Sequence, residues 1–453
     1  MSSNKRRKLQ ICHPDAAGID IGSREHWVAV PEDRDAETVR PFGTFTSDLH
    51  RLVDWLATCG VKTVAMESTG VYWVPLYEIL EERGFEVLLV NAEHVRNVPG
   101  RKSDVKDCGW IQELHTYGLL RASFRPSAEI AVLRAYVRQR QMLVESAARH
   151  IQHMQKALML MNIQVHHVLT DITGTTGMRI VRGLVAGQHD PNELAAYRDA
   201  RCSASRDEIA AALTGNYKTE HVFALGQALS LYDAYQKHLQ ECDSRIEQQL
   251  AVLAKSTARP DQTLRKLGKG KREGKDAPKF DIRSPLHQIT GGIDLTDVPG
   301  IASTTALNVI AEVGSDMGRW PTEKHFASWT NLAPGTTKTG GKLKTGRRPR
   351  AKNRVGYLLR QAAMSVGRTT SALGAFYRRL AARCGKAKAI VATARKLAVA
   401  IYHMLKEGRP FCDIGAGAYE ASYRERRVRS LRSQAKALGF ELHAAPEAAP
   451  AAT

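Results

Sequence analysis

Short apolar runs alternate with amphipathic segments over the first quarter of the chain. Three β-prone runs follow one another closely and predict an antiparallel meander. Helical and strand patterns then alternate, beginning with a segment that has Ser47 as its expected cap and Leu49, Leu52, Val53 and Leu56 on one face. Three strands followed by helix, strand, helix, strand and helix are the order expected of an α/β, ribonuclease-H-like domain. The predicted strands are 16–21, 27–31, 40–45, 62–66 and 86–91, and the predicted helices are 47–58, 73–83 and one opening near Asp104.

The middle of the chain carries a helical pattern. From about residue 127 to 162, apolar residues recur mostly at steps of three and four, which predicts one helix of roughly 50 Å. Glycines and threonines at 173–177 interrupt this pattern, and a second one runs from about 206 to 255 with a break near Gly215. Two long helices joined by a turn region indicate an antiparallel coiled-coil arm or a dimerisation element. A helical bundle without heptad packing is the alternative.

The last third is mostly α-helical and rich in basic residues. A cationic linker precedes the Pro299-Gly300 turn, after which Thr304 lies in the first turn of a predicted helix. A turn of this kind exposes backbone N–H groups to a phosphate and resembles the helix-hairpin-helix module, although Pro-Gly before a helix is also a common turn. The segment 332–350 contains hydroxyls, paired glycines and cations, and predicts a loop that approaches a phosphodiester closely. Helices are predicted at 353–368, 372–383 and 387–405.

These patterns divide the chain into five parts. They are an α/β catalytic domain at 1–125, a long-helix assembly region at 126–260, a basic linker at 261–285, a mostly α-helical C-terminal domain at 286–410, and a basic, Ala/Pro-rich tail at 411–453.

Charge narrows the choice of partner. The 453 residues carry 66 Lys and Arg against 46 Asp and Glu, a net charge of +20, so a polyanion is expected. Nucleic acid is favoured over a membrane because the sequence has no apolar run of about 18 residues. No secretory signal is visible, so we expect a cytoplasmic, nucleoid-associated protein. The seven cysteines form no CxxC pair, which argues against a zinc ribbon or a disulfide framework.

Four acidic residues are candidates for chemistry. Asp104 and Asp107 are three residues apart at the start of a predicted helix, a spacing that places both carboxylates on one face. Asp20 and Glu67 each lie at or near the end of a β-prone run. Four carboxylates suit one or two Mg²⁺ ions, a pair of which can clamp a phosphate. The alternative is that Asp104 caps the helix, Asp107 stabilises its first turn, and the other two are ordinary strand-end acids.

A set of motifs in fixed order resembles one family of recombinases. The motifs are Gly18–Ile21, Met66–Trp73, Lys102–Asp107, Val298–Ile301, Leu332–Gly335, Thr339–Lys342 and Ala375–Leu380. Together they are similar to the DEDD transposases of insertion-sequence family one-ten and its eleven-eleven subgroup. The resemblance implies a Holliday-junction-resolvase-like N-terminal domain that binds Mg²⁺ through Asp20, Glu67, Asp104 and Asp107. It also implies guidance by a bridge RNA that the element encodes.

The resemblance further implies a nucleophile that this sequence alters. The family places a serine before paired small residues, whereas here Thr339 precedes Gly340-Gly341. A threonine hydroxyl is chemically competent when activated, although its β-branch crowds the attack. Thr339 is therefore the predicted nucleophile and Thr345 the second choice, and the alternative is that Thr339 only lines a phosphate-binding turn.

The expected activity is Mg²⁺-dependent cutting and rejoining of DNA, which excises and inserts a mobile element, by a homo-oligomer, either a dimer or a tetramer. One alternative is a metal-dependent nuclease or resolvase that forms no covalent intermediate, and another is a nucleic-acid-binding protein without catalysis. The predicted nucleic-acid contacts are Arg101, Lys102, Gly300, Thr304, Lys338, Gly340, Gly341, Lys342, Arg347, Arg348 and Arg354.

Overall fold

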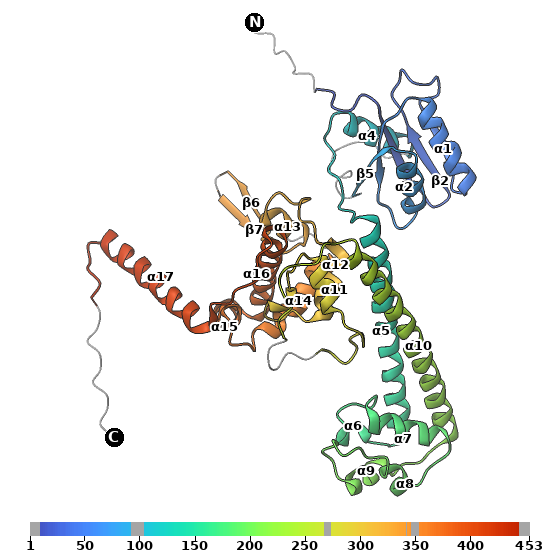
Figure 1. The fold of residues 1–453 in the computed structure, drawn as a ribbon, viewed down its shortest axis with the longest axis vertical. Helices are drawn as coiled ribbons and strands as arrows, with labels where there is room; N and C mark the ends of the chain where they lie inside the picture. The colour runs from blue at the N-terminus through green and yellow to red at the C-terminus, as the bar shows by residue number, and fades with distance from the viewer. Residues whose placement is uncertain (1–9, 92–103, 267–272, 341, 346–352, 444–453) are drawn as a thin grey trace. The chain divides into compact units, whose positions relative to one another are not determined.

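The computed structural model describes residues 10–91, 104–266, 273–340, 342–345 and 353–443, without the side chains of 104–106, 336–339 and 342–345. The chain forms two compact units, Met1–Arg125 and Pro126–Thr453. Figure 1 shows strands β1 to β5 in the first unit, and the long helices together with the β6–β7 hairpin in the second.

The first unit is built on a five-stranded mixed sheet. Strands β1 to β3 form an antiparallel meander, and β1, β4 and β5 run parallel, in the order β3-β2-β1-β4-β5. This is the predicted order of elements, and it fits a ribonuclease-H-like α/β domain. The strands are β1 (Ala16–Ile21), β2 (Glu25–Ala29), β3 (Val39–Gly43), β4 (Thr63–Glu67) and β5 (Glu86–Val90).

Helices cover both faces of this sheet. Helices α1 (Thr46–Thr58) and α2 (Trp73–Glu82) bury their apolar faces against alternate strand residues such as Ile19 and Met66. Helix α4 (Asp104–Thr116) packs on the opposite face, where Ile111 contacts Ala65. Because side chains alternate along a strand, residues one position away from Ile19 and Met66 point toward α4.

The start of α1 corrects one prediction. Ser47 lies inside the first turn, because the helix begins at Thr46 with Phe45 in the N-cap position. The Asp48 carboxylate, three residues further along, accepts a hydrogen bond from the backbone N–H of Phe45 at 3.3 Å. This bond ties the first turn of α1 to the N-cap residue without a hydroxyl cap.

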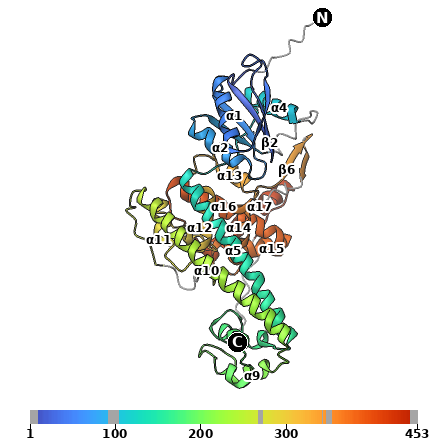
Figure 2. The same cartoon turned by 90° about the vertical axis from the view of Figure 1, so that its right-hand side faces the viewer.

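The second unit begins with a two-helix arm. Helices α5 (Ala128–Leu160) and α10 (Thr219–Lys255) lie side by side (Figures 1 and 2). They are antiparallel, since α5 meets α10 through Glu129 with Gln249 near one end and His150 with Tyr235 toward the other. Between these contacts, Arg140 and Asp243 form an ion pair in a seam that is otherwise largely apolar.

A small helical lobe lies at the far end of the arm. Its core joins residues of α5 and α10 to those of four shorter helices. The predicted break near Gly215 is confirmed, because the chain leaves the helix between Leu213 and Thr219. The shorter helices are α6 (Val165–Val168), α7 (Thr175–Val185), α8 (Pro191–Ala195) and α9 (Arg206–Leu213).

The C-terminal part of this unit is a helical body with one hairpin. Helix α16 (Lys386–Glu407) packs against α13, α14 and α15. The strands β6 (Thr336–Thr339) and β7 (Lys342–Thr345) form the hairpin. Within the described ranges, every helix is too short or too polar to cross a lipid bilayer. The remaining elements are α11 (Arg283–Ile289), the 3₁₀ turn η1 (Leu295–Asp297), α12 (Ser303–Val313), α13 (Glu323–Trp329), α14 (Arg354–Val366), α15 (Ala372–Cys384) and α17 (Gly415–Ala437).

Candidate active site and nucleic-acid interface

The parallel pairing of β1 and β4 brings two of the predicted acids to one edge of the sheet. Ile19 pairs with Met66, so the next residues along the two strands, Asp20 and Glu67, are neighbours. Adjacent strands lie about 4.8 Å apart, and both acids belong to the set of positions that faces α4. The fold therefore places two half-buried carboxylates side by side at the carboxyl ends of two central strands.

Helix α4 crosses β1 at Gly18 in very close contact. A Cβ added at Gly18 would lie 2.3 Å from both the Cys108 carbonyl oxygen and the Gln112 nitrogen. Gln112 also donates a hydrogen bond from Nε2 to the Ala16 carbonyl at 3.3 Å. Only glycine allows two backbones to approach in this way.

The direction of α4 carries its first turn toward Asp20. The helix and the strand are antiparallel, since Thr116 accepts the backbone N–H of Cys12 while Cys108 lies over Gly18. Four helical residues advance about 6 Å, close to the rise of two strand residues. The backbone at Asp104, four residues before Cys108, is therefore level with Asp20.

The electrostatics of Cys108 agree with this placement. The pKa of the Cys108 thiol is raised to about 11, chiefly by burial and in smaller part by the negative charges of Asp20 and Asp107. Asp107 and Asp20 thus both lie close enough to one buried thiol to act on it. Glu67 accepts a hydrogen bond from the Thr69 hydroxyl at 2.9 Å.

The donor chemistry of this edge fits a hard divalent cation. Carboxylate oxygens from β1, β4 and α4 are the ligands that Mg²⁺ prefers, and zinc would more often draw on Cys or His. Among the side chains that the structure describes, no three His, Cys, Asp or Glu are grouped as a metal site. Asp104 is not among those side chains.

The predicted Thr339 loop is instead a β-hairpin. Thr336 pairs with Thr345 and Thr339 with Lys342, and Gly340 directly follows the first strand. Gly340 has φ +56°, a conformation that glycine adopts without strain. Paired glycines between β-prone residues are a hairpin signal that the loop interpretation overlooked. Thr339 therefore ends a strand, next to the turn.

Around α12, groups predicted to contact phosphate lie against other parts of the protein. Gly300 has φ +85°, and a Cβ there would lie 2.8 Å from the Ala362 carbonyl of α14, so this glycine serves helix packing. At the start of α12, the backbone N–H of Ser303 donates to the Glu273 carboxylate at 3.1 Å. Thr304 is half-buried in the same turn. Contact of Gly300 or Thr304 with phosphate stays a prediction.

A buried carboxylate at the root of the arm escaped the sequence analysis. Glu312 of α12 is 5% exposed and forms ion pairs with Arg134 and Arg138 of α5 at 2.9 and 2.8 Å. Arg354, a predicted nucleic-acid contact, lies 3.3 Å from the same carboxylate. Burial alone would raise the pKa of Glu312, but the hydrogen bond from Arg138 and the charge of Arg134 hold it below 4.5. This charged cluster joins α5, α12 and α14.

Several predicted nucleic-acid contacts lie outside the described residues. The side chains of Lys338 and Lys342 are not described, although both residues belong to the hairpin. The residues outside the description altogether are Arg101, Lys102, Gly341, Arg347 and Arg348.

Two family models match the chain. Residues 17–163 match a model of the DEDD transposase of IS110, and residues 294–378 match one described as a transposase of the IS116/IS110/IS902 family. The first match contains the four acids and the second contains the hairpin with Thr339. A search of curated proteins finds no match.

Proposed function

The chain belongs to the IS110 family of transposases, enzymes that act on DNA, and from this premise we propose a division of labour between its two units. Asp20, Glu67, Asp104 and Asp107 bind one or two Mg²⁺ ions. Thr339 supplies the hydroxyl that attacks the DNA backbone. The chain thereby cuts and rejoins strands at the ends of a mobile element and at its target.

The observation that carries the metal proposal is the crossing of α4 over β1. The register of β1 and β4 makes Asp20 and Glu67 neighbours, and the close approach at Gly18 directs the start of α4 to the same edge. Bound Mg²⁺ would stabilise the negative charge that develops on a phosphate during cleavage. The chain's own part is to hold the carboxylates ionised and in place.

The hairpin supports the assignment of Thr339 because strand pairing fixes the backbone up to and including that residue. In the proposed step, a bond forms between the threonine oxygen and phosphorus while the bond from phosphorus to the next sugar oxygen breaks. The hydroxyl proton ends on the released sugar oxygen. Attack by a DNA hydroxyl on this ester would then reverse the step with a new strand.

The metal proposal is tested by neutralising Asp20 and Glu67 one at a time. Asp20→Asn and Glu67→Gln are expected to abolish strand cleavage in Mg²⁺ and to leave the Kd for the same DNA within about twofold. Glu86→Gln is the matched control, since Glu86 is an exposed acid at the opposite end of the sheet. Equal loss of DNA binding in Asp20→Asn would assign that residue a structural role.

The nucleophile is tested with a nicked DNA substrate that traps a covalent adduct. Wild-type protein is expected to form a protein–DNA band that survives denaturation, and Thr339→Ala to form none. Thr339→Ser restores an unbranched hydroxyl and should form the adduct at least as fast. Cleavage without any adduct would identify a hydrolytic nuclease or resolvase, and an adduct that depends on Thr345 would move the assignment. No cleavage under any condition would leave only a binding protein.

RNA guidance and self-association complete the proposal. The net charge of +20 provides for binding of RNA and DNA together, and the two-helix arm provides an elongated surface for contact between copies. Cleavage is expected to require a guide RNA that the element encodes, acting with a dimer or tetramer of the protein. Full activity after nuclease removal of RNA, or activity of an isolated monomer, would contradict this part.

A further inference from the structure

A groove in the C-terminal body lies next to the hairpin that carries Thr339. It has a volume of about 710 Å³ and is bounded by α13, α15, α16 and the segment that leads into β6. This volume is within the range of roughly 300–1,000 Å³ that small-molecule sites span. Pro334 lines the groove and is two residues before the first strand of the hairpin. The groove and Thr339 are therefore connected by a short stretch of chain.

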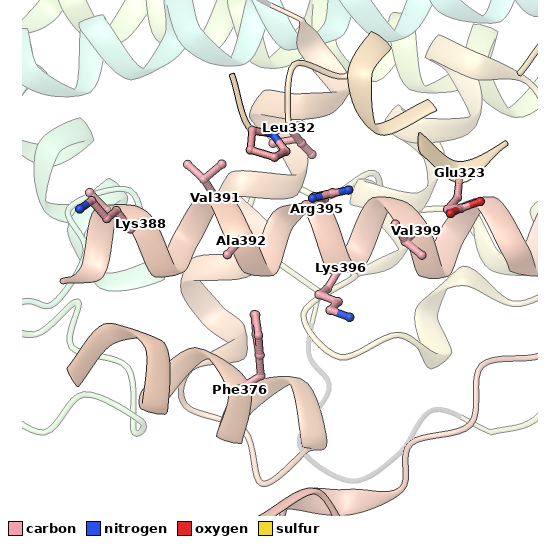
Figure 3. Close-up of a pocket in the computed structure, with 11 residues that line it drawn as sticks. Glu323, Leu332, Phe376, Lys388, Val391, Ala392, Arg395, Lys396 and Val399 are labelled. Atoms are coloured by element: carbon pink, nitrogen blue, oxygen red, sulfur yellow. The ribbon is translucent and has the colours of Figure 1, made fainter. Parts of the chain in front are cut away.

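Much of the groove lining is apolar and includes an aromatic ring. Leu332 and Pro334 line it on the hairpin side, and Phe376 reaches it from α15 (Figure 3). The ring of Phe376 rests edge-on against Tyr419 of α17, with 6.5 Å between the ring centres. Phe376 is only partly buried, so part of it remains available inside the groove.

Three cations also line the groove. Lys388, Arg395 and Lys396 come from α16, which also contributes apolar residues such as Val391, and Glu323 of α13 is the one acid of the lining. Within the part of the chain that the structure describes, these three cations form no ion pair. Cations left without protein partners around an apolar floor are suited to a ligand with a flat apolar portion and a negative portion.

We propose that this groove binds an unpaired nucleotide of the DNA strand on which the chain acts. The base packs against Phe376 and Pro334, and the neighbouring phosphates contact Lys388, Arg395 and Lys396. Stacking on an aromatic ring beside a cationic track is how proteins hold single strands without reading sequence. A paired base cannot enter, because its edges and faces are occupied in the duplex, so the site selects a strand that has been opened.

DNA is chosen over other occupants for two reasons. Three cations against one acid favour an anionic ligand over a basic peptide, and Pro334, which lines the groove, lies two residues before the hairpin that carries Thr339, the proposed nucleophile. In this respect the inference rests on the proposed function. The test is therefore made without Mg²⁺ and without cleavage, so its outcome does not depend on which residues prove catalytic.

The first experiment locates the contact by photocrosslinking. The full chain is mixed, in metal-free buffer, with single-stranded DNA that carries 5-iododeoxyuridine, irradiated, digested and examined by mass spectrometry. An adduct on Phe376 is expected with the single strand and not with the matching duplex. Adducts confined to peptides outside the groove would overturn the proposal, as would equal labelling by the duplex.

The second experiment compares a DNA single strand with an abasic strand of equal length, which has the same phosphates and no bases. Phe376→Leu is expected to weaken binding of the normal strand by roughly tenfold and to leave the abasic strand unchanged. Lys396→Gln should weaken both, whereas Lys406→Gln, an equal charge change outside the groove on the same helix, should weaken neither. Equal unfolding midpoints would establish that the variants fold.

An RNA strand of the same sequence separates the two nucleic acids. DNA is expected to label Phe376 more strongly than RNA and to lose more affinity in Phe376→Leu. Preferential labelling by RNA would reassign the groove to RNA and overturn the proposal. A Phe376→Leu variant that binds the normal and abasic strands as the wild type does would show that no base packs there.

Discussion

Substituting Gly18 by alanine tests the contact that organises the acidic edge. The added methyl carbon would lie 2.3 Å from two backbone atoms of α4 and 2.8 Å from a third, whereas ordinary contacts are 3.4–4 Å. Backbone atoms cannot rotate away as a side chain can. Helix α4 would therefore have to move away from β1 by about 1 Å.

Two effects of Gly18→Ala can be estimated from this displacement. Overpacking of this size costs about 1–3 kcal/mol in the free energy of unfolding. A shift of about 1 Å in α4 also moves Asp107 and the start of the helix relative to Asp20, and a misplacement of that size can lower the rate of cleavage by roughly 100-fold. Cleavage should therefore fall more than the loss of folded protein explains.

The assays are urea unfolding and Mg²⁺-dependent cleavage of a labelled DNA substrate. Gly109→Ala is the matched control, because Gly109 lies in the same helix and a Cβ there meets nothing within 4 Å. In a helix, alanine is favoured over glycine by up to about 1 kcal/mol, so this variant should be at least as stable as wild type and fully active. Unchanged stability and cleavage in Gly18→Ala would refute the assigned contact.

Three further predictions concern charged and titratable groups. Asp243→Ala removes the ion-pair partner of Arg140, which keeps its hydrogen bond to the Asp276 carbonyl, and should lower the free energy of unfolding by about 2 kcal/mol, measured with urea; no change would mean that solvent replaces the ion pair. Glu312→Gln leaves three arginines uncompensated and should lower the free energy of unfolding by about 3 kcal/mol or more. Because the folded pKa of Glu312 is below 4.5, the wild type should lose its stability advantage over this variant as pH falls below 4.5. Burial, and to a smaller extent the charge of His13, lowers the pKa of His115 from 6.5 to about 4. The stability that this residue contributes should therefore be complete above pH 6.5 and be lost as pH falls toward 4. A His115 imidazole that titrates near 6.5 in the NMR spectrum would contradict this.

The sheet was predictable from sequence because its strands are short apolar runs with clear boundaries. Strand β2 begins and ends two residues earlier than predicted, and β3 begins one residue and ends two residues earlier. The neighbouring placement of Asp20 and Glu67 follows from the order of the strands. The role of Gly18 did not follow, because it depends on a helix that begins more than 80 residues later in the chain.

Two elements of the C-terminal region were missed for different reasons. The hairpin has a local signal, the paired glycines at 340–341, but its high charge and low apolar content favoured a loop. Helix α17, at Gly415–Ala437, occupies a region predicted as a tail. None of its residues is buried, so the sequence shows no apolar stripe that would indicate a packed helix. Its alanine, arginine and glutamate content favours a helix without any apolar stripe. It is tied to α15 through Arg379, which stacks on Tyr419 and Tyr423.

The cluster around Glu312 could not be predicted from sequence. Its partners come from α5 and α14, and Arg134 precedes Glu312 by 178 residues. In the sequence, the surroundings of these arginines do not differ from those of the many solvated cations of this basic chain. No local pattern therefore marked them as buried ion-pair partners. Long-range ion pairs of this kind are visible only once the helices are packed.

The unbroken course of α5 gives the protein a fixed internal spacing. The helix is anchored near Arg138 by Glu312 and continues without interruption to Leu160, inside the core of the distal lobe. At 1.5 Å per residue, the lobe is held roughly 30 Å from that anchor. The arm thus keeps the lobe, and any ligand bound to it, at a fixed distance from the helical body. Inserting a few residues into both helices would change that distance and rotate the lobe about the axis of the arm.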